Sequence, residues 1–218
     1  MLEGTILKDA LLGSKNLFFH DALKERPHPI LRSGLHATAA VNIRRFFEET
    51  DYVKAAAKTI KKMLNRHKTL QMRSQYYTFV GSGSSSVTIS YEVAKLYGGR
   101  HVFTDKGPDG TQICRSDFRD GERILLVEDV ETRGTSSKET IAAILQKNPN
   151  VEIKKSIACV VAWHDPLELL PEYEVLPLLD LSGHMNTMEE GECTLCKLGS
   201  KAIPLKEPGN WAKFIKDY

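Results

Sequence analysis

The sequence lacks any long uncharged apolar run. A helix that spans a bilayer needs about 20 predominantly apolar residues, and no stretch of the 218 residues approaches that length. The segment Met1–Asp9 has early acids and no long apolar core, so it does not have the pattern of a signal peptide. We therefore expect no membrane partner.

Cysteine is scarce, and charge of either sign is not in excess. The 4 cysteines are too few for a disulfide framework in a chain of 218 residues, so a reducing, cytoplasmic setting is expected. The net charge of +2 is too small to indicate a nucleic-acid partner. A hydrophobic content of 41% is ordinary for a globular protein, and the length allows a sizeable core within one domain.

The chain also lacks internal repeats and low-complexity segments. From residue 75 onward, strand patterns alternate with helix patterns, which predicts an α/β fold with a mostly parallel sheet flanked by helices. Helices are expected over 2–14, 50–66 and 87–97, and strands over 76–80, 101–103 and 154–163. The tail, 183–218, has little periodicity and is expected to pack over the site or an interface.

One stretch has the pattern of a phosphorylated-sugar site. The apolar run 124–127 ends in Glu128 and Asp129, and a helix pattern begins at Thr135. Helix N-termini suit phosphate because their N–H groups are unpaired, and paired carboxylates suit sugar hydroxyls or Mg²⁺. The alternative is an ordinary buried strand followed by a capped helix. Two acids directly after four apolar residues serve no packing purpose.

A second polar loop follows the strand expected over 76–80. It contains Gly81, Ser82, Gly83, Ser84 and Ser85, and it opens a helix. A loop of this kind at the carboxyl end of a parallel strand is typical of an anion site. The alternative is a flexible turn. Because the acidic strand is also present, we interpret this loop as a second phosphate site.

The stretch 124–136 resembles the signature of the type I phosphoribosyltransferases: an apolar run, two acids, two further residues and then Thr-x-Gly-Thr-Ser. The resemblance implies that family's fold in a single domain, 1–218. Its core would lie at about 50–182, and a small hood would be built from about 1–49 and 183–218.

The resemblance also implies site roles. Glu128 and Asp129 would meet the ribose hydroxyls of phosphoribosyl pyrophosphate (PRPP), and the loop at 81–85 would take its pyrophosphate. Mg²⁺ would arrive with PRPP, with Asp129 as the candidate protein ligand. The loop that would hold the 5′-phosphate comprises Val130, Glu131, Thr132, Arg133, Gly134, Thr135 and Ser136. Arg133 stands where the family usually has a small residue, so it would either add a phosphate contact or crowd the loop.

Residues 104–119 occupy the position of the family's mobile catalytic loop, which brings a basic residue over the pyrophosphate. Lys106 is the matching residue, and Arg115 is a further candidate. The alternative is a solvated hairpin tip. In homodimers of the family this loop reaches the neighbouring subunit's site, so the resemblance also predicts a homodimer.

The turn Arg32-Ser33-Gly34 is similar to the N-terminal motif of the orotate phosphoribosyltransferases, where it frames the pyrimidine and the pyrophosphate. The alternative is a plain turn. The helix 91–98 and the tail 192–209 are also similar to one branch of that family. We therefore predict transfer of the phosphoribosyl group from PRPP to orotate, which is a step of pyrimidine biosynthesis. Transfer to another nucleobase, or a non-catalytic PRPP-binding regulator on the same fold, remains the alternative.

Two other features have weaker interpretations. Cys193 and Cys196 form half of a zinc site, but the chain has no second Cys-x-x-Cys, and His184 is the only His nearby in sequence. Free thiols or a redox-sensitive pair are expected instead, and a site shared across a dimer stays open. His164-Asp165 is expected to form a turn rather than an acid–base pair.

Overall fold

The centre of the molecule is a six-stranded sheet. The computed structural model describes residues 4–23, 25–31, 33–70, 72, 76–164 and 167–216. In it the strand order is β10-β9-β8-β5-β6-β7, and every neighbouring pair is parallel except β6 and β7. This confirms the predicted mostly parallel sheet. The strands are β5 (Thr78–Gly81), β6 (Arg100–Lys106), β7 (Gln112–Cys114), β8 (Arg123–Glu131), β9 (Glu152–Ala162) and β10 (Glu174–Asp180).

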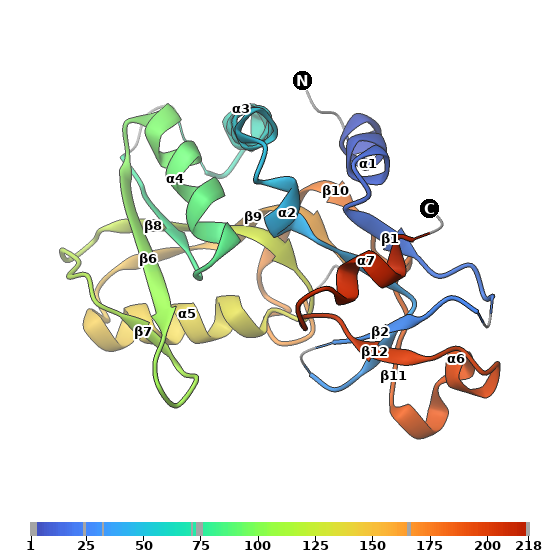
Figure 1. Ribbon diagram of the computed structural model, residues 1–218. Helices are drawn as coiled ribbons and strands as arrows, with labels where there is room; N and C mark the ends of the chain where they lie inside the picture. The colour runs from blue at the N-terminus through green and yellow to red at the C-terminus, as the bar shows by residue number, and fades with distance from the viewer. Residues whose placement is uncertain are drawn as a thin grey trace.

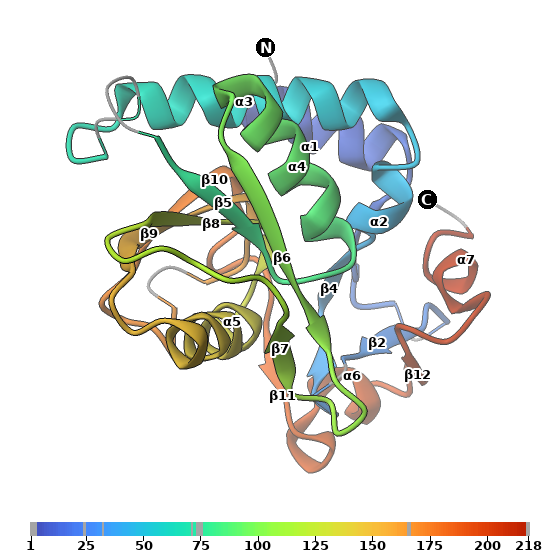
Figure 2. The ribbon, with the colours of Figure 1, turned by 90° about the vertical axis from the view of Figure 1, so that its left-hand side faces the viewer.

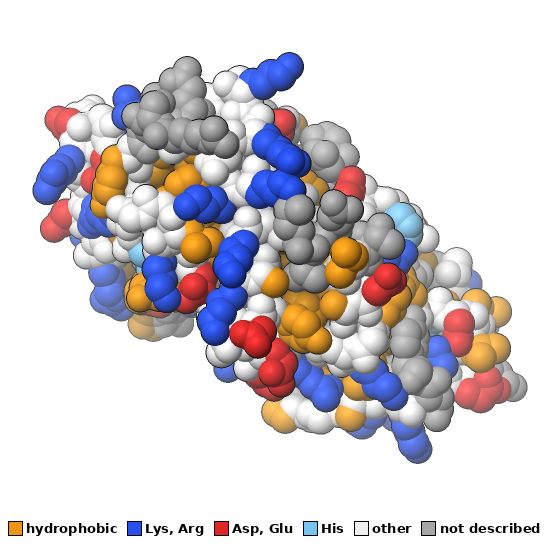
Figure 3. Space-filling model, turned by 90° about the horizontal axis from the view of Figure 1, so that it is seen from above, with side chains coloured by type: hydrophobic (Ala, Val, Ile, Leu, Met, Phe, Trp, Pro, Cys, Tyr) orange, Lys and Arg blue, Asp and Glu red, His pale blue; other side chains and the backbone are white. Residues whose placement is uncertain are grey.

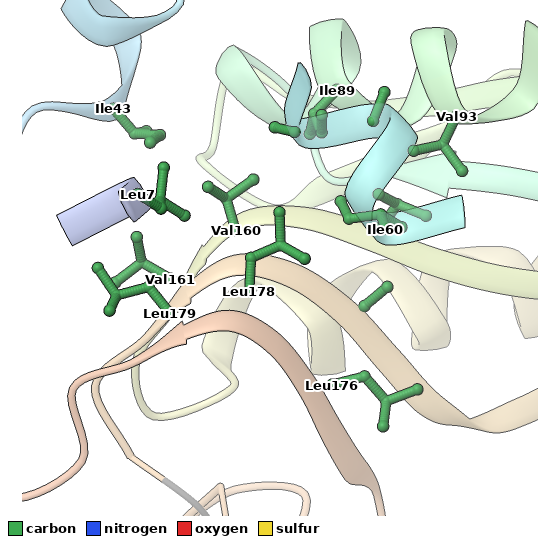
Figure 4. Packing of buried hydrophobic residues seen from close by; sticks show 14 of the residues in the cluster. Leu7, Ile43, Ile60, Ile89, Val93, Val160, Val161, Leu176, Leu178 and Leu179 are labelled. Carbon is green, nitrogen blue, oxygen red and sulfur yellow. The ribbon is translucent and has the colours of Figure 1, made fainter. Parts of the chain in front are cut away.

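Helices cover both faces of this sheet (Figures 1 and 2). On one face lie α3 (Thr50–Arg66) and α4 (Ser85–Tyr97), and on the other lies α5 (Thr135–Lys147). Figure 4 shows Ile60 of α3 and Ile89 of α4 beside Val160 of β9, within one cluster of buried side chains. The bounds of α3 are those predicted from its apolar spacing. In the part of the chain that is described, no helix is long and apolar enough to cross a membrane.

The solvent side of α3 is basic. Five Lys or Arg residues lie on this helix, and Figure 3 shows blue side chains in a row across the face that it covers. Val53, Ala56 and Leu64, on its other side, are buried in the core. This amphipathic pattern is enough to place the helix on the sheet, because its apolar stripe repeats at helical spacing.

A separate small sheet joins the two ends of the chain. Its order is β11-β3-β2-β12, and β12 pairs with β2 in parallel, whereas β11 pairs with β3 antiparallel. The strands are β2 (His28–Ile30), β3 (His36–Ala37), β11 (Thr187–Met188) and β12 (Ala202–Pro204). A short antiparallel pair lies beside them, formed by β1 (Leu17–Phe19) and β4 (Ala39–Val41).

We call this region the hood, and it comprises the strands above with the short helices η1 (Glu190–Glu192), α6 (Thr194–Lys197) and α7 (Asn210–Phe214). It lies to the right of the main sheet in Figure 1. Elements from the segment 1–49 also pack on the core. Leu7 of α1 (Gly4–Gly13) and Phe46 of α2 (Ile43–Phe46) lie in the main hydrophobic cluster, as do Leu17, Ala37 and Ala39 of the hood strands.

Candidate functional site

The site lies where two neighbouring parallel strands end. β5 and β8 pair in register, with Val80 opposite Leu126, so the loops that follow them leave the same edge of the sheet. The loop after β5 leads into α4, and the loop after β8 leads into α5. Two helix N-termini and the acidic end of β8 are therefore brought together, at the carboxyl edge where ligands of parallel α/β sheets bind.

Glu128 joins these two loops. The Ser82 N–H donates to its Oε1 at 3.1 Å, and the Ser82 hydroxyl donates to its Oε2 at 2.6 Å. The side chain is buried, and burial, together with the nearby Glu131 and Asp129, raises the pKa of its carboxyl well above the usual range. Both of its oxygens are thus engaged, and its predicted contact with a ribose hydroxyl stays a prediction.

Asp129 is the most accessible of the three acids at this edge. It is half-buried, and burial raises the pKa of its carboxyl to about 6. Hydrogen bonds from the Val130 N–H and the Ser85 hydroxyl oppose that shift, as does the positive charge of Lys206 in the tail. The tail therefore approaches the acidic edge closely enough to act on its charge.

Glu131 is the third acid of this group. Its carboxylate accepts a hydrogen bond from the Ser137 hydroxyl in the first turn of α5. Burial raises the pKa of this carboxyl to about 7, and the charge of Asp129 adds to the shift. The end of β8 therefore gathers three carboxyl groups in a poorly solvated place, where each holds its proton more tightly than usual and where an incoming cation or hydroxyl donor would favour the charged form.

The N-terminus of α5 has the form of an anion site. Its N-cap is Gly134, with φ of 87°, and no side chain of the described residues caps the helix there. A Cβ on Gly134 would also lie 3.3 Å from Leu167, so this position requires glycine. Thr135 and Ser136 lie in the first turn, where backbone N–H groups are left without intrahelical partners. These positions suit the predicted 5′-phosphate.

Arg133 is turned toward a neighbouring loop. Its Nε and Nη2 donate to the two carboxylate oxygens of Glu168, at 2.5 and 2.7 Å, and the pair is exposed. The Arg133 carbonyl also accepts from the Leu169 N–H at 3.0 Å. The side chain thus neither crowds the loop nor contacts its helix N-terminus in this structure, and a contact with phosphate would require it to leave Glu168.

The loop after β5 is tightly constrained. A Cβ on Gly81 would lie 2.7 Å from the Ser86 carbonyl oxygen, so only glycine fits there. Ser84 has φ of 53° and ψ of −123°, a conformation that costs a non-glycine residue on the order of 1–3 kcal/mol. Strain of this kind persists where the surroundings hold it, which is common at ligand sites.

The predicted lid is the β6–β7 hairpin, and it packs on α5. Lys106 donates from Nζ to Glu139 Oε2 at 2.6 Å. Arg115 is exposed and lies 3.9 Å from Asp105. Gln112 donates from Nε2 to the Ser82 carbonyl at 2.6 Å, so the hairpin is also bonded to the loop after β5. Lys106 and Arg115 both lie in the predicted lid. The acidic residues near them are Glu139 and Asp105, not the three acids at the end of β8.

The remaining predicted positions lie in the hood or beyond the described residues. Ser33 and Gly34 are in the turn between β2 and β3, where the Gly34 N–H donates to the Leu31 carbonyl at 3.0 Å. Arg32 and Asp165 lie outside the described residues. The predicted framing of the base by this turn therefore stays a prediction.

Sequence reasoning missed three side chains that act on the site. Gln112 ties the hairpin to the loop after β5, Lys206 acts on Asp129, and Glu168 holds Arg133. None has a spacing that marks it, because each reaches the site from a different segment of the chain. Two signals were available: Gln112 lies within the predicted lid, 104–119, and Lys206 lies in the family-like tail.

The donor set fits Mg²⁺ that is held mainly by a substrate. Both oxygens of Glu128 are bonded to Ser82, and Glu131 is bonded to Ser137. Half-buried Asp129 is the one carboxylate of the three that an incoming ion can reach. Mg²⁺ is commonly bound by one or two carboxylates together with substrate phosphates, and this edge offers such an arrangement.

Curated proteins similar to this chain include orotate phosphoribosyltransferases. The chain is 30% identical over 184 residues to the orotate phosphoribosyltransferase of Thermotoga maritima, covering 84% of this chain and 90% of that protein. It is also 30% identical over 194 residues to the orotate phosphoribosyltransferase of Caldicellulosiruptor saccharolyticus, covering 87% and 91%. No family model matches the sequence.

Solved structures share the fold. The orotate phosphoribosyltransferase from Aeropyrum pernix superposes with a TM-score of 0.62 at 17% identity, covering 80% of this chain and 94% of that one. The adenine phosphoribosyltransferase from Thermoanaerobacter pseudethanolicus superposes with a TM-score of 0.53 at 14% identity, covering 65% and 88%. The predicted type I phosphoribosyltransferase fold is thereby confirmed.

Proposed function

The chain belongs to the orotate phosphoribosyltransferase family, and on that premise we propose that it transfers the phosphoribosyl group of PRPP to orotate, giving orotidine 5′-monophosphate and pyrophosphate. It is thus a pentosyltransferase of pyrimidine biosynthesis. The observation that carries the proposal is the junction of β5 and β8, where two anion-type loops flank buried acids.

The reaction needs opposite charges to be stabilised at two ends of the same substrate. Breaking the bond from C1′ to pyrophosphate leaves positive charge on the ribose ring and negative charge on the leaving group. Asp129, whose pKa of about 6 leaves it charged at neutral pH, supplies negative charge beside the ring and is placed to accept hydrogen bonds from ribose hydroxyls. The N–H groups at Thr135 and Ser136 hold the 5′-phosphate and orient the reacting carbon.

The leaving pyrophosphate would be bound by the loop after β5 and by the β6–β7 hairpin. The loop from Ser82 to Ser85 opens α4 and offers hydroxyls and N–H groups to pyrophosphate. Bound Mg²⁺ would neutralise part of the phosphate charge, with Asp129 as its protein ligand. Lys106 would exchange its contact with Glu139 for one with pyrophosphate as the hairpin closes. A homodimer, in which this hairpin serves the neighbouring site, is part of the proposal.

A base-specificity assay tests the function. Orotate consumption would be followed by absorbance with PRPP and Mg²⁺, beside parallel reactions with uracil, adenine, guanine and hypoxanthine. We expect turnover of orotate alone. Turnover of another base would overturn the base assignment, and PRPP binding without turnover of any base would overturn catalysis in favour of a regulator.

A mixing experiment tests the homodimer. The variants Lys106→Ala and Asp129→Asn would be combined, so that a mixed dimer contains one site with a wild-type lysine from one subunit and a wild-type aspartate from the other. Activity should return on mixing if Lys106 acts across the dimer. If the two inactive variants stay inactive when mixed dimers have formed, the lysine does not act in the neighbouring site.

A further inference from the structure

The hood contains a compact group of nitrogen and sulfur donors that includes none of the three acids at the edge of the main sheet. One donor atom from each of four side chains lies within 4.8 Å of the other three. Three of the side chains are buried and the fourth is half-buried. The four are His28, His36, Cys193 and Cys196.

The strand pairing of the hood explains why residues so distant in sequence meet. His28 lies opposite Ala202 of β12, and His36 lies opposite Met188 of β11. The segment between β11 and β12 contains the Cys193-x-x-Cys196 turn. The two strands that flank this turn are therefore paired with the two strands that carry the histidines. Figure 1 shows α6 beside this sheet.

The separations match a tetrahedral zinc shell. Zn–S bonds of 2.3 Å and Zn–N bonds of 2.0–2.1 Å place neighbouring donors about 3.3–3.8 Å apart. Here Cys193 Sγ and Cys196 Sγ each lie 3.5 Å from His28 Nε2, and Cys196 Sγ lies 3.3 Å from His36 Nδ1. The two imidazole nitrogens are 3.0 Å apart, slightly closer than in a filled shell.

The surrounding hydrogen bonds orient these donors. His28 Nδ1 is 2.8 Å from Ser200 Oγ, and that hydroxyl donates to the Arg26 carbonyl at 2.7 Å. Ser200 Oγ therefore accepts a hydrogen bond from the protonated Nδ1 of His28, which leaves the lone pair of His28 Nε2 directed at the thiols. The Cys196 N–H donates to Cys193 Sγ at 3.4 Å. Supporting contacts of this kind are typical around metal ligands, whose tautomer and direction they fix.

Apolar packing holds the strands of the hood but does not extend to the segment that carries the two cysteines. One cluster lies within the hood and comprises Phe18, Ala40, Ile203, Trp211, Phe214 and Ile215, and Leu17, Ala37 and Ala39 of the hood strands join the main cluster. Within the described residues, the segment 186–202 contributes no member to any of the three hydrophobic clusters. A short segment without an apolar core needs another source of stability, and a structural metal is one that small folds use.

We propose that the hood holds a structural Zn²⁺ ion in a closed Cys₂His₂ site formed by His28, His36, Cys193 and Cys196. Four protein donors leave no open position for a substrate or water, so the ion stabilises and does not catalyse. Binding converts the two thiols to thiolates and releases their protons to solvent. The expectation that one chain lacks enough ligands is thereby corrected: the missing pair comes from β2 and β3, which no sequence spacing links to the tail.

Metal analysis of the purified, reduced protein tests the site without any activity measurement. We expect about one equivalent of zinc per chain by mass spectrometry, falling to background in Cys193→Ser and in Cys196→Ser. Cys114→Ser is the matched control, because Cys114 is also a buried free thiol but lies in β7, and it should retain its zinc. Circular dichroism would establish that each variant is folded.

A second measurement does not depend on variants. Wild-type protein stripped of metal by a chelator would be titrated with Zn²⁺ alone and with Co²⁺ alone. We expect stoichiometric binding and the visible absorption of tetrahedral cobalt with thiolate ligands. Absence of zinc from the purified protein together with no binding on titration would overturn the proposal, as would zinc retained in both cysteine variants or stoichiometric iron in its place. None of these outcomes bears on orotate turnover.

Discussion

The carboxyl edge of the sheet gathers three acids beside one another, whereas the hood gathers two imidazoles against two thiols. At the sheet edge, Glu128 and Glu131 are buried with pKa values raised by burial and by like charge. In the hood, the donor atoms are neutral or weakly acidic side chains at metal-like separations. Burying the three acids without a ligand costs folding free energy, whereas the four hood donors are arranged around a position that the proposed metal ion would fill.

The two regions differ because their supports differ. The sheet edge is built on β8, whose neighbours on both sides are parallel strands and whose apolar residues are buried in two hydrophobic clusters. A core of this kind can hold strained or repelling groups such as Ser84 and the acids. The hood has no comparable core around α6, so its polar group must itself contribute stability.

The largest expected effect on turnover comes from removing the charge of Asp129 at the carboxyl edge of the sheet. Asp129→Asn should lower orotate turnover on the order of 1,000-fold, because it removes negative charge from the place where the ribose becomes positive. Steady-state kinetics with saturating PRPP measure it. Asp51→Asn is the control, since Asp51 is an exposed aspartate on α3, and it should leave turnover unchanged. Near-normal turnover of the Asp129 variant would refute the role.

The same variant should be more stable than the wild type at neutral pH. The pKa of Asp129 is raised from its ordinary value of 3.8 to about 6, so the folded state binds more protons than the unfolded state in that range. Its charged form therefore destabilises the fold as pH rises through this window. We expect Asp129→Asn to gain about 1–2 kcal/mol at pH 8 and nothing below about pH 4, measured by denaturant unfolding at both pH values.

A smaller loss of turnover is expected when Lys106 of the β6–β7 hairpin is replaced. Lys106→Ala should lower kcat on the order of 100-fold while changing PRPP binding little, because the lysine acts on charge that develops in the transition state. Glu139→Gln is its partner variant, since it only releases Lys106 from α5, and it should keep kcat. Equal losses in kcat and in PRPP affinity for Lys106→Ala would point to simple binding instead.

Removing the proposed zinc ion from the hood should weaken orotate binding more than it slows the chemical step. The proposed ion joins β2 and β3, and the turn between them contains Ser33 and Gly34, which we expect to frame the base. Metal-stripped enzyme, assayed after the chelator is replaced by Mg²⁺, should show a higher KM for orotate, on the order of 10-fold, with kcat nearly kept. A fall in kcat with unchanged KM would separate the hood from base binding.

Local sequence patterns predicted where the residues of the sheet-edge site lie, whereas the donor group of the hood depends on pairing between segments distant in sequence. Glu128, Asp129 and the loop to Ser136 are contiguous in sequence, so strand and helix periodicity placed them correctly at the end of β8. The parallel order of the strands also followed from their alternation with helices. β10 was not predicted, although the structure places it in the main sheet.

A hood was predicted, but its group of His and Cys donors was not, because these contacts join segments 160 or more residues apart. His28 and Cys193 meet only after β12 has paired with β2, and no periodicity of either segment encodes that pairing. Lys206 and Glu168 were missed for the same reason, since each acts on a residue from another element. Arg133 could be flagged from sequence as unusual, but its partner could not.

Arg133→Thr should have the smallest effect. The Arg133–Glu168 pair is bidentate but exposed, and exposed ion pairs contribute about 0–1 kcal/mol to stability. Because the side chain is turned away from the helix N-terminus at Thr135, removing it should leave the KM for PRPP within about threefold, which is less than 1 kcal/mol. Glu168→Gln, which frees the arginine, is the matched variant. If Arg133→Thr instead raises that KM tenfold or more while Glu168→Gln lowers it, then Arg133 exchanges Glu168 for the 5′-phosphate in the working enzyme.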